Sequence, residues 1–182
     1  MQLSFVPLEA ASLEILDAFS STFGKFRYCS CMRWRLSSGE FGKATKEERG
    51  DELRARVSQG DPVGVFAICE GEPVAWVSVG PRETFAGLER SKTLARVDDQ
   101  PVWSITCMFI APSLRRRKVT ERLIEAAASY ARSSGASIVE AYPVEATAAS
   151  YTYMGTPGTL ERCGFSEVTP DDRKRRVFRR RV

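Results

Sequence analysis

Residues 102–120 read VWSITCMFIAPSLRRRKVT and join an apolar strand to the start of a helix. The first nine are almost all β-formers, which indicates a strand buried on both faces, and Pro112 ends it. From Leu114 onward, apolar residues recur every three or four positions up to Gly135, which predicts a helix with a glycine C-cap. A further strand over 137–142 completes a β-α-β unit, so these two strands should be parallel with a right-handed crossover.

The rest of the chain adds strands and helices around this unit. The sequence predicts a strand over 2–8, helices from Leu13 and over about 46–57, a hairpin of 63–69 with 74–79, a short helix over 84–91, a short helix ending at Cys163 and one or two final strands. The expected fold class is α/β (α+β), a mixed sheet with helices on both faces. With 182 residues, we expect one domain over 1–182.

The chain contains no histidine, which excludes Ser-His-Asp and Cys-His nucleophile systems, histidine zinc ligands and a histidine base. Its five cysteines are an odd number, and only Cys29 and Cys31 are close together, so we expect free thiols and no metal site. No secretory signal precedes them and no apolar run approaches a membrane span, so the sequence indicates a cytoplasmic protein without membrane contact.

Positive charge is concentrated near residue 180. The net charge is +4, yet residues 173–181 read RKRRVFRRR and hold seven basic residues and no acid. We interpret 173–182 as a basic terminal strand and frayed tail with solvated arginines. Nucleic-acid binding through this tail is the less favoured alternative, because a general nucleic-acid surface spreads its charge over the fold.

A second basic run lies where the strand passes into the helix. Arg115, Arg116, Arg117 and Lys118, followed by Val119 and Thr120, are expected in the first turn of that helix. Helix N-termini expose unpaired N–H groups and positive potential, which bind phosphates. Because four cations there oppose the helix dipole, an anionic ligand is expected to offset them.

In this order and spacing, the strand 104–110, the turn 115–117, Ile138-Val139-Glu140-Ala141-Tyr142-Pro143 and Gly164-Phe165 resemble the GNAT-type N-acetyltransferase superfamily over roughly residues 60–170. The resemblance implies a mostly antiparallel sheet with a central splayed parallel pair. It also implies an acetyl-CoA-dependent enzyme without a metal, in which a small-molecule or peptide amine attacks the thioester directly. A homodimer is one possible assembly, and nucleic acid is not an expected partner.

The resemblance places acetyl-CoA along the strand end and the basic turn. The residues it assigns to binding are Cys107, Met108, Phe109, Ile110, Arg115, Arg116, Arg117, Lys118, Val119 and Thr120. A backbone N–H near Cys107–Phe109 would polarise the thioester carbonyl. The family pattern at the turn is Arg/Gln-x-x-Gly-x-Gly/Ala, and this chain departs from it with Lys118 and Thr120. Helical φ/ψ angles do not require glycine at these positions, so we expect binding to be retained.

The acid and base are the least specified part of the resemblance. Leu160 stands where the family often has a catalytic tyrosine, so we name Tyr153 as the candidate acid, with Tyr151 also nearby. The favoured alternative for Tyr153 is a packing or rim residue. Glu140 is the candidate base; the alternative is that its side chain points to solvent at a strand end. These departures leave two alternatives open. One is a catalytically degenerate acyl-CoA sensor or interaction module of the same fold, and the other is the nucleic-acid-binding protein.

Residues between the early helices are the last candidates. In the family this stretch shapes the acceptor site, so the resemblance allows Arg33, Trp34 and Arg35 to face an acceptor amine. The favoured interpretation is an ordinary buried loop. Cys107 lacks a histidine partner and is expected in the core, not as an acyl nucleophile.

Overall fold

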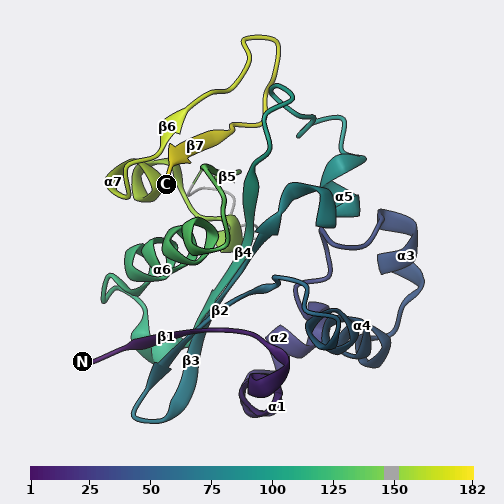
Figure 1. Ribbon diagram of the computed structural model, residues 1–182, viewed down its shortest axis with the longest axis vertical. Coiled ribbons are helices and arrows are strands. Elements are labelled where there is room, and N and C mark those ends of the chain that lie inside the picture. Colours follow the sequence, from purple (N-terminus) through teal and green to yellow (C-terminus); the bar gives the residue numbers. More distant parts are fainter. Residues whose placement is uncertain (146–151) are drawn as a thin grey trace.

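The computed structural model describes residues 1–145 and 152–182, and within them every side chain except those of Ala10, Lys25, Arg27, Tyr28 and Thr152. Its centre is a seven-stranded sheet in the order β1-β2-β3-β4-β5-β7-β6 (Figure 1). The strands are β1 (Ser4–Pro7), β2 (Gly64–Cys69), β3 (Glu72–Pro81), β4 (Trp103–Ile110), β5 (Ile138–Ala141), β6 (Ser166–Glu167) and β7 (Phe178–Arg181).

One strand pair decides the topology. β4 and β5 are parallel, with Trp103 opposite Val139 and Ile105 opposite Ala141, whereas all other neighbouring strands are antiparallel. The β-α-β unit and the mixed, mostly antiparallel sheet expected from the sequence are therefore confirmed.

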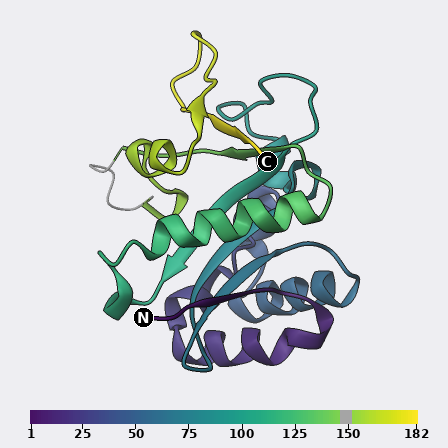
Figure 2. The same ribbon diagram turned by 60° about the vertical axis from the view of Figure 1, so that its left-hand side comes forward.

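Helices cover both faces of this sheet. On one face lie α6 (Val119–Ser133) and α7 (Pro157–Arg162), and on the other lie α1 (Leu13–Thr22), α2 (Gly24–Cys29) and α4 (Lys46–Ser58) (Figures 1 and 2). The short helices α3 (Ser38–Lys43) and α5 (Ala86–Glu89) lie in the connections. Each face has its own core, because Leu123 and Ala127 of α6 pack on one side of the strands while Phe19 of α1 packs on the other.

A third core cluster lies beside the upper part of the sheet. It consists of Phe85, Leu88, Leu94, Tyr142, Met154 and Val177, with Trp34 and Tyr153 packed against it. Met154 belongs to the 3-10 turn η4 (Thr152–Met154), which lies in contact with β4. The cluster thus joins four separate segments next to the strand that decided the topology.

The hairpin of β2 and β3 forms where the sequence predicts it. Its turn residues Glu70 and Gly71 both have positive φ angles, 52° and 86°, as a tight two-residue hairpin turn requires. At the other end of β2, a Cβ on Gly64 would lie 2.2 Å from the Val77 carbonyl oxygen, so only glycine allows β3 to approach so closely.

Two expectations need correction. The helix expected from Leu114 begins only at Val119, because Pro112–Leu114 form a 3-10 turn (η3) and the residues after it form an irregular turn. The basic segment after residue 172 is not a frayed tail with solvated arginines. Its strand β7 lies inside the sheet between β5 and β6, and Arg179 and Arg180 form ion pairs with acidic side chains.

Candidate functional site

β4 extends beyond the end of β5, its parallel neighbour, which leaves a gap in the sheet. Its last paired residue toward β5 is Ile105, so the strand from Thr106 to Ile110 runs on without β5 beside it. β5 ends at Ala141, opposite Ile105, and a β-bulge lies at the same point of β4: Cys107 pairs with Ser78 and Ile105 with Val79, so Thr106 has no opposite residue on β3. A bulge bends and twists its strand, and this one lies where β4 and β5 part.

The free edge of β4 presents backbone groups to this gap. The Ala111 N–H donates to the Val74 carbonyl on the β3 side, 2.9 Å away. Hydrogen-bonded pairs alternate along an antiparallel ladder, so residue 109 also bonds toward β3, while the N–H groups of Met108 and Ile110 point the other way. Two backbone donors, the N–H groups of Met108 and Ile110, therefore face the gap. Within the predicted donor segment Cys107–Phe109, only the Met108 N–H points this way, and Ile110 lies outside that segment.

The basic turn directly follows this strand end. Arg115, Arg116, Arg117 and Lys118 are all exposed, and within the described residues none of their side chains forms an ion pair or a hydrogen bond. Arg116 and Lys118 have left-handed φ angles of 62° and 56°. The expectation that helical angles make glycine unnecessary at Lys118 is wrong, since this residue is the N-cap of α6 in a conformation that favours glycine.

The first turn of α6 adds further donors. The Arg122 N–H makes the first bond within the helix, to the Lys118 carbonyl at 3.4 Å, so the N–H groups of Val119, Thr120 and Glu121 precede that ladder. The N-cap side chain does not accept a bond from any of them. These N–H groups and the four cations form one positive surface at the mouth of the gap.

The chain matches the family model described as "Acetyltransferase (GNAT) family" over residues 30–155. It belongs to the GNAT acetyltransferase family. No curated protein matches it. Among solved structures, it is similar to the polyamine N-acetyltransferase of Drosophila melanogaster that catalyses the formation of N-acetylagmatine, with a TM-score of 0.60, 16% identity and full coverage of both chains.

Two further solved structures share this GNAT fold. One is the PaiA N-acetyltransferase of Thermoplasma acidophilum in complex with coenzyme A, with a TM-score of 0.55, 13% identity and full coverage of both chains. The other is the ribosomal-protein-alanine N-acetyltransferase of Brucella melitensis, with a TM-score of 0.56 and 18% identity over 98% of this chain and 99% of that one. At these identities the likeness establishes the fold.

In this GNAT chain, the candidate base Glu140 is fully buried at the centre of an ion-pair network. Arg82 Nη1 donates to its Oε1 at 2.6 Å and Arg179 Nε to its Oε2 at 2.7 Å. The Tyr142 hydroxyl donates to Oε1 at 2.6 Å and also bonds with the Ser104 hydroxyl at 2.7 Å. The alternative of a solvent-facing carboxylate is therefore wrong, and an amine could reach this carboxylate only by displacing a guanidinium or the phenol.

The network also shifts the pKa values of its members. Burial and the adjacent Glu140 carboxylate raise the pKa of Tyr142 well above its usual value. Burial alone would lower the pKa of Arg82, but Tyr142, Glu140 and Glu89 outweigh it and the pKa is raised. Arg82 is only 1% exposed and also donates to the Glu89 carboxylate at 2.8 Å. The Tyr142 hydroxyl therefore stays protonated and the Arg82 guanidinium stays charged through the neutral pH range.

The candidate acid lies on a segment that contacts β4. Tyr153 is on η4, partly buried against the third core cluster, two residues before Gly155, whose Cβ position is 3.0 Å from the Met108 side chain. Leu160 is fully buried in α7 and supplies no titratable group. Tyr151 lies outside the described residues. The catalytic roles of Glu140 and Tyr153 remain predictions.

The opposite side of the strand end is closed by aromatic rings and thiols. The Phe109 ring packs against Phe23 and Phe19, with centroids 5.1 and 5.4 Å away. Cys107 is partly exposed, and its hydrogen bond with the buried Cys31 thiol contributes most to the raised pKa of Cys31. A thiol held this way remains protonated, in line with a packing role for these cysteines.

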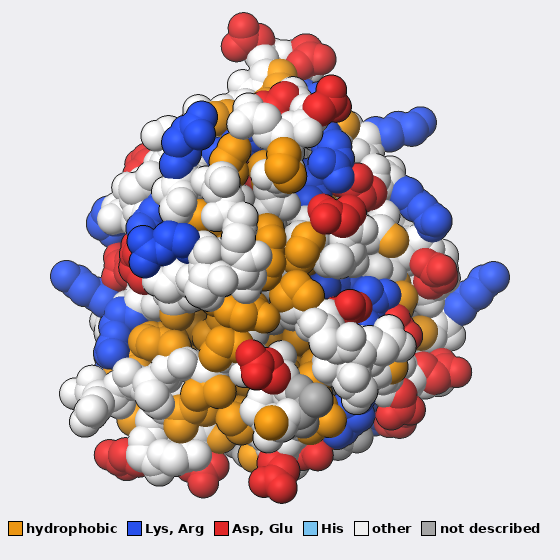
Figure 3. All heavy atoms as spheres, viewed as in Figure 1, with side chains coloured by type: hydrophobic (Ala, Val, Ile, Leu, Met, Phe, Trp, Pro, Cys, Tyr) orange, Lys and Arg blue, Asp and Glu red, His pale blue; other side chains and the backbone are white. Residues whose placement is uncertain are grey.

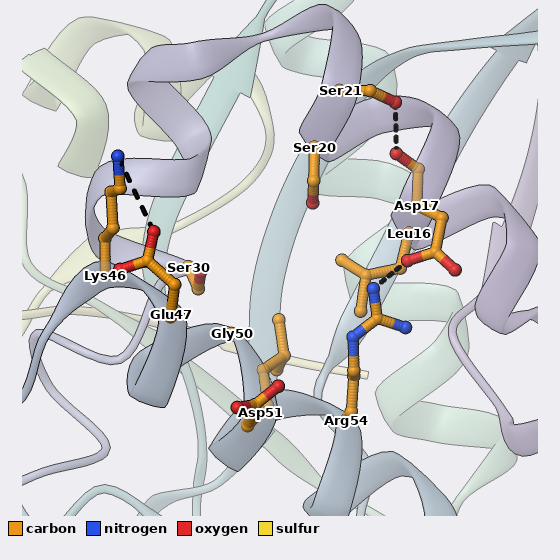
Figure 4. Close-up of a pocket in the computed structure, with 11 residues that line it drawn as sticks. Leu16, Asp17, Ser20, Ser21, Ser30, Lys46, Glu47, Gly50, Asp51 and Arg54 are labelled. Carbon is orange, nitrogen blue, oxygen red and sulfur yellow. Dashed lines mark hydrogen bonds and ion pairs between the residues drawn. The ribbon is translucent and has the colours of Figure 1, made fainter.

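Hollows also lie outside this region, and two of them lie on opposite sides of the sheet. Between α1, α2 and α4, a cavity of about 260 Å³ holds the ion pairs Lys46–Glu47 and Arg54–Asp17 (Figure 4). On the other side of the sheet, a groove between β1 and α6 gathers apolar side chains such as Phe5 and Tyr130 (Figure 3). Neither hollow includes a residue of the basic turn.

The described residues offer neither a metal-binding cluster nor a membrane-spanning helix. Over 1–145 and 152–182, no group of three or more Cys, Asp or Glu side chains is arranged to hold a metal ion. In the same part of the chain, every helix is too short or too polar to cross a membrane.

Proposed function

We propose that this chain is an N-acetyltransferase that uses acetyl-CoA to acetylate an amine. The observation that carries the proposal is the continuity of the gap with the turn: the Met108 and Ile110 N–H groups lead directly to the exposed cations Arg115–Lys118 and the α6 N-terminus. Family membership supports the same activity, and a relative with this fold was solved with coenzyme A.

The residues present suit such a ligand. A diphosphate would lie against the N–H groups of Val119, Thr120 and Glu121 and the neighbouring guanidiniums, which are charge-assisted donors. An acyl carbonyl in the gap would accept hydrogen bonds from Met108 or Ile110, whose N–H groups are fixed by the β4 ladder. Acetyl-CoA supplies the activated thioester. The amine nitrogen bonds to the acetyl carbon and the C–S bond breaks. The amine loses a proton, the departing CoA thiolate takes one up, and the products are the N-acetylated amine and the free thiol of CoA.

A non-catalytic acyl-CoA-binding module is the second candidate. Three observations favour it: Lys118 holds a left-handed conformation without being glycine, Leu160 stands at the tyrosine position, and Glu140 is bonded by two arginines. Two experiments separate the candidates. Calorimetry with acetyl-CoA tests binding, and absent binding contradicts both. Thiol release in the presence of amines then tests turnover, and binding without release in a broad amine panel selects the module.

The nucleic-acid alternative loses its basis in the described structure. Arg176, Arg179 and Arg180 form ion pairs within the chain, and Arg173 and Arg175 donate to backbone carbonyls. Of the seven basic residues in this segment, five are therefore engaged by the fold itself.

A further inference from the structure

Two buried hydrogen-bond donors at the third core cluster lack an acceptor within residues 1–145 and 152–182. The indole N–H of Trp34 (Nε1) and the Nε of Arg175 are both inaccessible to solvent, and neither has a partner among these residues. A buried donor without an acceptor costs about 1–3 kcal/mol, so native structures rarely leave one unpaired. Two such atoms against one cluster point to an acceptor group that a ligand would bring.

Both donors border the third core cluster. Trp34 packs against the third core cluster, and Arg175 Nη2 lies 3.6 Å from the Sδ of Met154 in that cluster. The residue after Met154 is Gly155, which adjoins the Met108 side chain on β4. An unbroken series of contacts therefore joins the donors to the strand whose N–H groups face the gap. The helix α5, labelled in Figure 1, is joined to the same segment, because its Gly87 N–H donates to the Trp34 carbonyl at 2.9 Å.

Around the third core cluster, the carboxylates are paired and positive charge is left over. The carboxylates beside it are already bonded to guanidiniums: Glu140 to Arg82 and Arg179, Glu89 to Arg82, and Asp98 to Arg179. A cationic group on an incoming acceptor would find these carboxylates engaged. Positive groups, by contrast, are in surplus there, because no ion pair forms at Arg175 among the described residues.

A neighbouring arginine adds to this surplus. Arg35 is 1% exposed, lies over the Phe85 ring at 4.2 Å, and donates only to neutral oxygens, the Thr84 hydroxyl and the Pro62 and Val63 carbonyls. Its Nε also lacks a partner within the described residues. Burial lowers the pKa of Arg35 to about 9, as expected of a guanidinium with no carboxylate bonded to it. An anion bound at the cluster would be attracted by this charge.

We infer that the acceptor carries a carboxylate next to its amine, as a free amino acid does, and that Trp34 Nε1 and Arg175 bind that carboxylate. Two N–H donors match the two oxygens of a carboxylate, and a guanidinium adds a charge-assisted bond. The inference rests on the proposed function. It separates this chain from the solved relative that forms N-acetylagmatine, since agmatine is an amine without a carboxylate.

The test compares amino acids with the amines left when their carboxylate is removed. L-arginine with agmatine, and L-lysine with cadaverine, are matched pairs within a panel of free amino acids. With saturating acetyl-CoA, we expect at least tenfold higher kcat/KM for carboxylate-bearing members, the size of a lost bond to a charged group. Equal or better turnover of the decarboxylated members overturns the inference.

A binding readout does not depend on turnover. In the protein with CoA, the ¹⁵N–¹H resonance of the Trp34 indole, assigned through Trp34→Phe, is expected to shift saturably with at least one amino acid and not with its decarboxylated partner. Arg175→Gln should weaken that binding at least tenfold, while Lys174→Gln, a neutralised exposed neighbour, should leave it unchanged. No carboxylate-dependent shift across the panel, or equal loss in both variants, overturns the inference.

The two hypotheses fail in distinguishable ways. Calorimetry of the same protein with acetyl-CoA reports on the turn and the gap alone. Absent acetyl-CoA binding contradicts the proposed function, whereas retained binding without discrimination between L-arginine and agmatine contradicts only the carboxylate site.

Discussion

Two arginine-rich segments of this chain have similar composition and opposite environments. In residues 173–181, the arginines reach acids and carbonyls of other segments, and Arg179 alone joins Glu140 and Asp98. In the turn of residues 115–118, no side chain of the described structure pairs with any of the four cations. Charge that the fold neutralises is available for stability, and charge that it leaves exposed is available for a ligand. The two segments should therefore respond to different measurements.

The largest expected effect tests the paired side of this contrast. Arg82→Met removes a guanidinium that is 1% exposed and leaves Glu140 buried with one arginine fewer. We expect the free energy of unfolding to fall by about 3–5 kcal/mol in urea denaturation, because breaking a buried pair leaves charge uncompensated. Arg117→Met is the matched control and should change it by less than about 0.5 kcal/mol. Similar losses in the two variants would abolish the contrast.

Ligand affinity tests the unpaired side. Arg117→Gln should weaken acetyl-CoA binding by about 1–3 kcal/mol in calorimetry, because a charge-assisted bond to phosphate is lost. The deficit should shrink as salt is added, since exposed charges are screened. Arg132→Gln, at the far end of α6, removes the same charge away from the turn and is expected to bind normally. Wild-type affinity in Arg117→Gln, and likewise in Arg115→Gln, would refute the phosphate assignment.

The backbone of the turn gives a smaller effect. Lys118→Gly removes the side chain from a residue with φ 56°, so the free energy of unfolding should rise by about 1 kcal/mol. Lys118→Ala removes the same charge but keeps the Cβ, and is expected to gain nothing in thermal denaturation. Tighter acetyl-CoA binding in the glycine variant alone would show that the Cβ obstructs the ligand. Equal stability of the two variants would contradict backbone strain at Lys118.

The smallest effect is a pH dependence confined to the paired segment. The hydrogen bond from Arg179 holds the pKa of Asp98 below its usual range. A carboxyl with a lowered folded-state pKa stabilises the fold above its unfolded pKa, near 3.9, and this contribution disappears as pH falls through the folded value. The stability difference between wild type and Asp98→Asn should thus narrow below about pH 4. A difference independent of pH between 3 and 6 would contradict it.

Local sequence patterns predicted most of the fold. The apolar run before Pro112 and the helical spacing after it predicted a parallel pair, and β4, α6 and β5 confirm it. The basic turn was found the same way, because it follows directly from that junction. These features depend on neighbours along the chain, where periodicity and turn residues are informative.

Side-chain contacts between residues far apart in the sequence could not be predicted from such local patterns. The partners of Glu140 lie 58 and 39 positions away, at Arg82 and Arg179, so its sequence neighbourhood indicated only an acid on an apolar strand. The left-handed Lys118 was equally hidden, since no glycine marks the position. Two arginine runs look alike in sequence, and only the tertiary contacts show which one the fold neutralises.

The place of β7 inside the sheet has a consequence for how the chain acquires its structure during synthesis. β5 is translated 37 or more residues before the strand that pairs with it, since Ala141 lies opposite Phe178. At about 5–20 residues per second, a few seconds separate them at the ribosome. Throughout that interval the Glu140 carboxylate lacks Arg179 and stays hydrated. The edge of the sheet at β5 therefore remains unpaired until β7 has been synthesised.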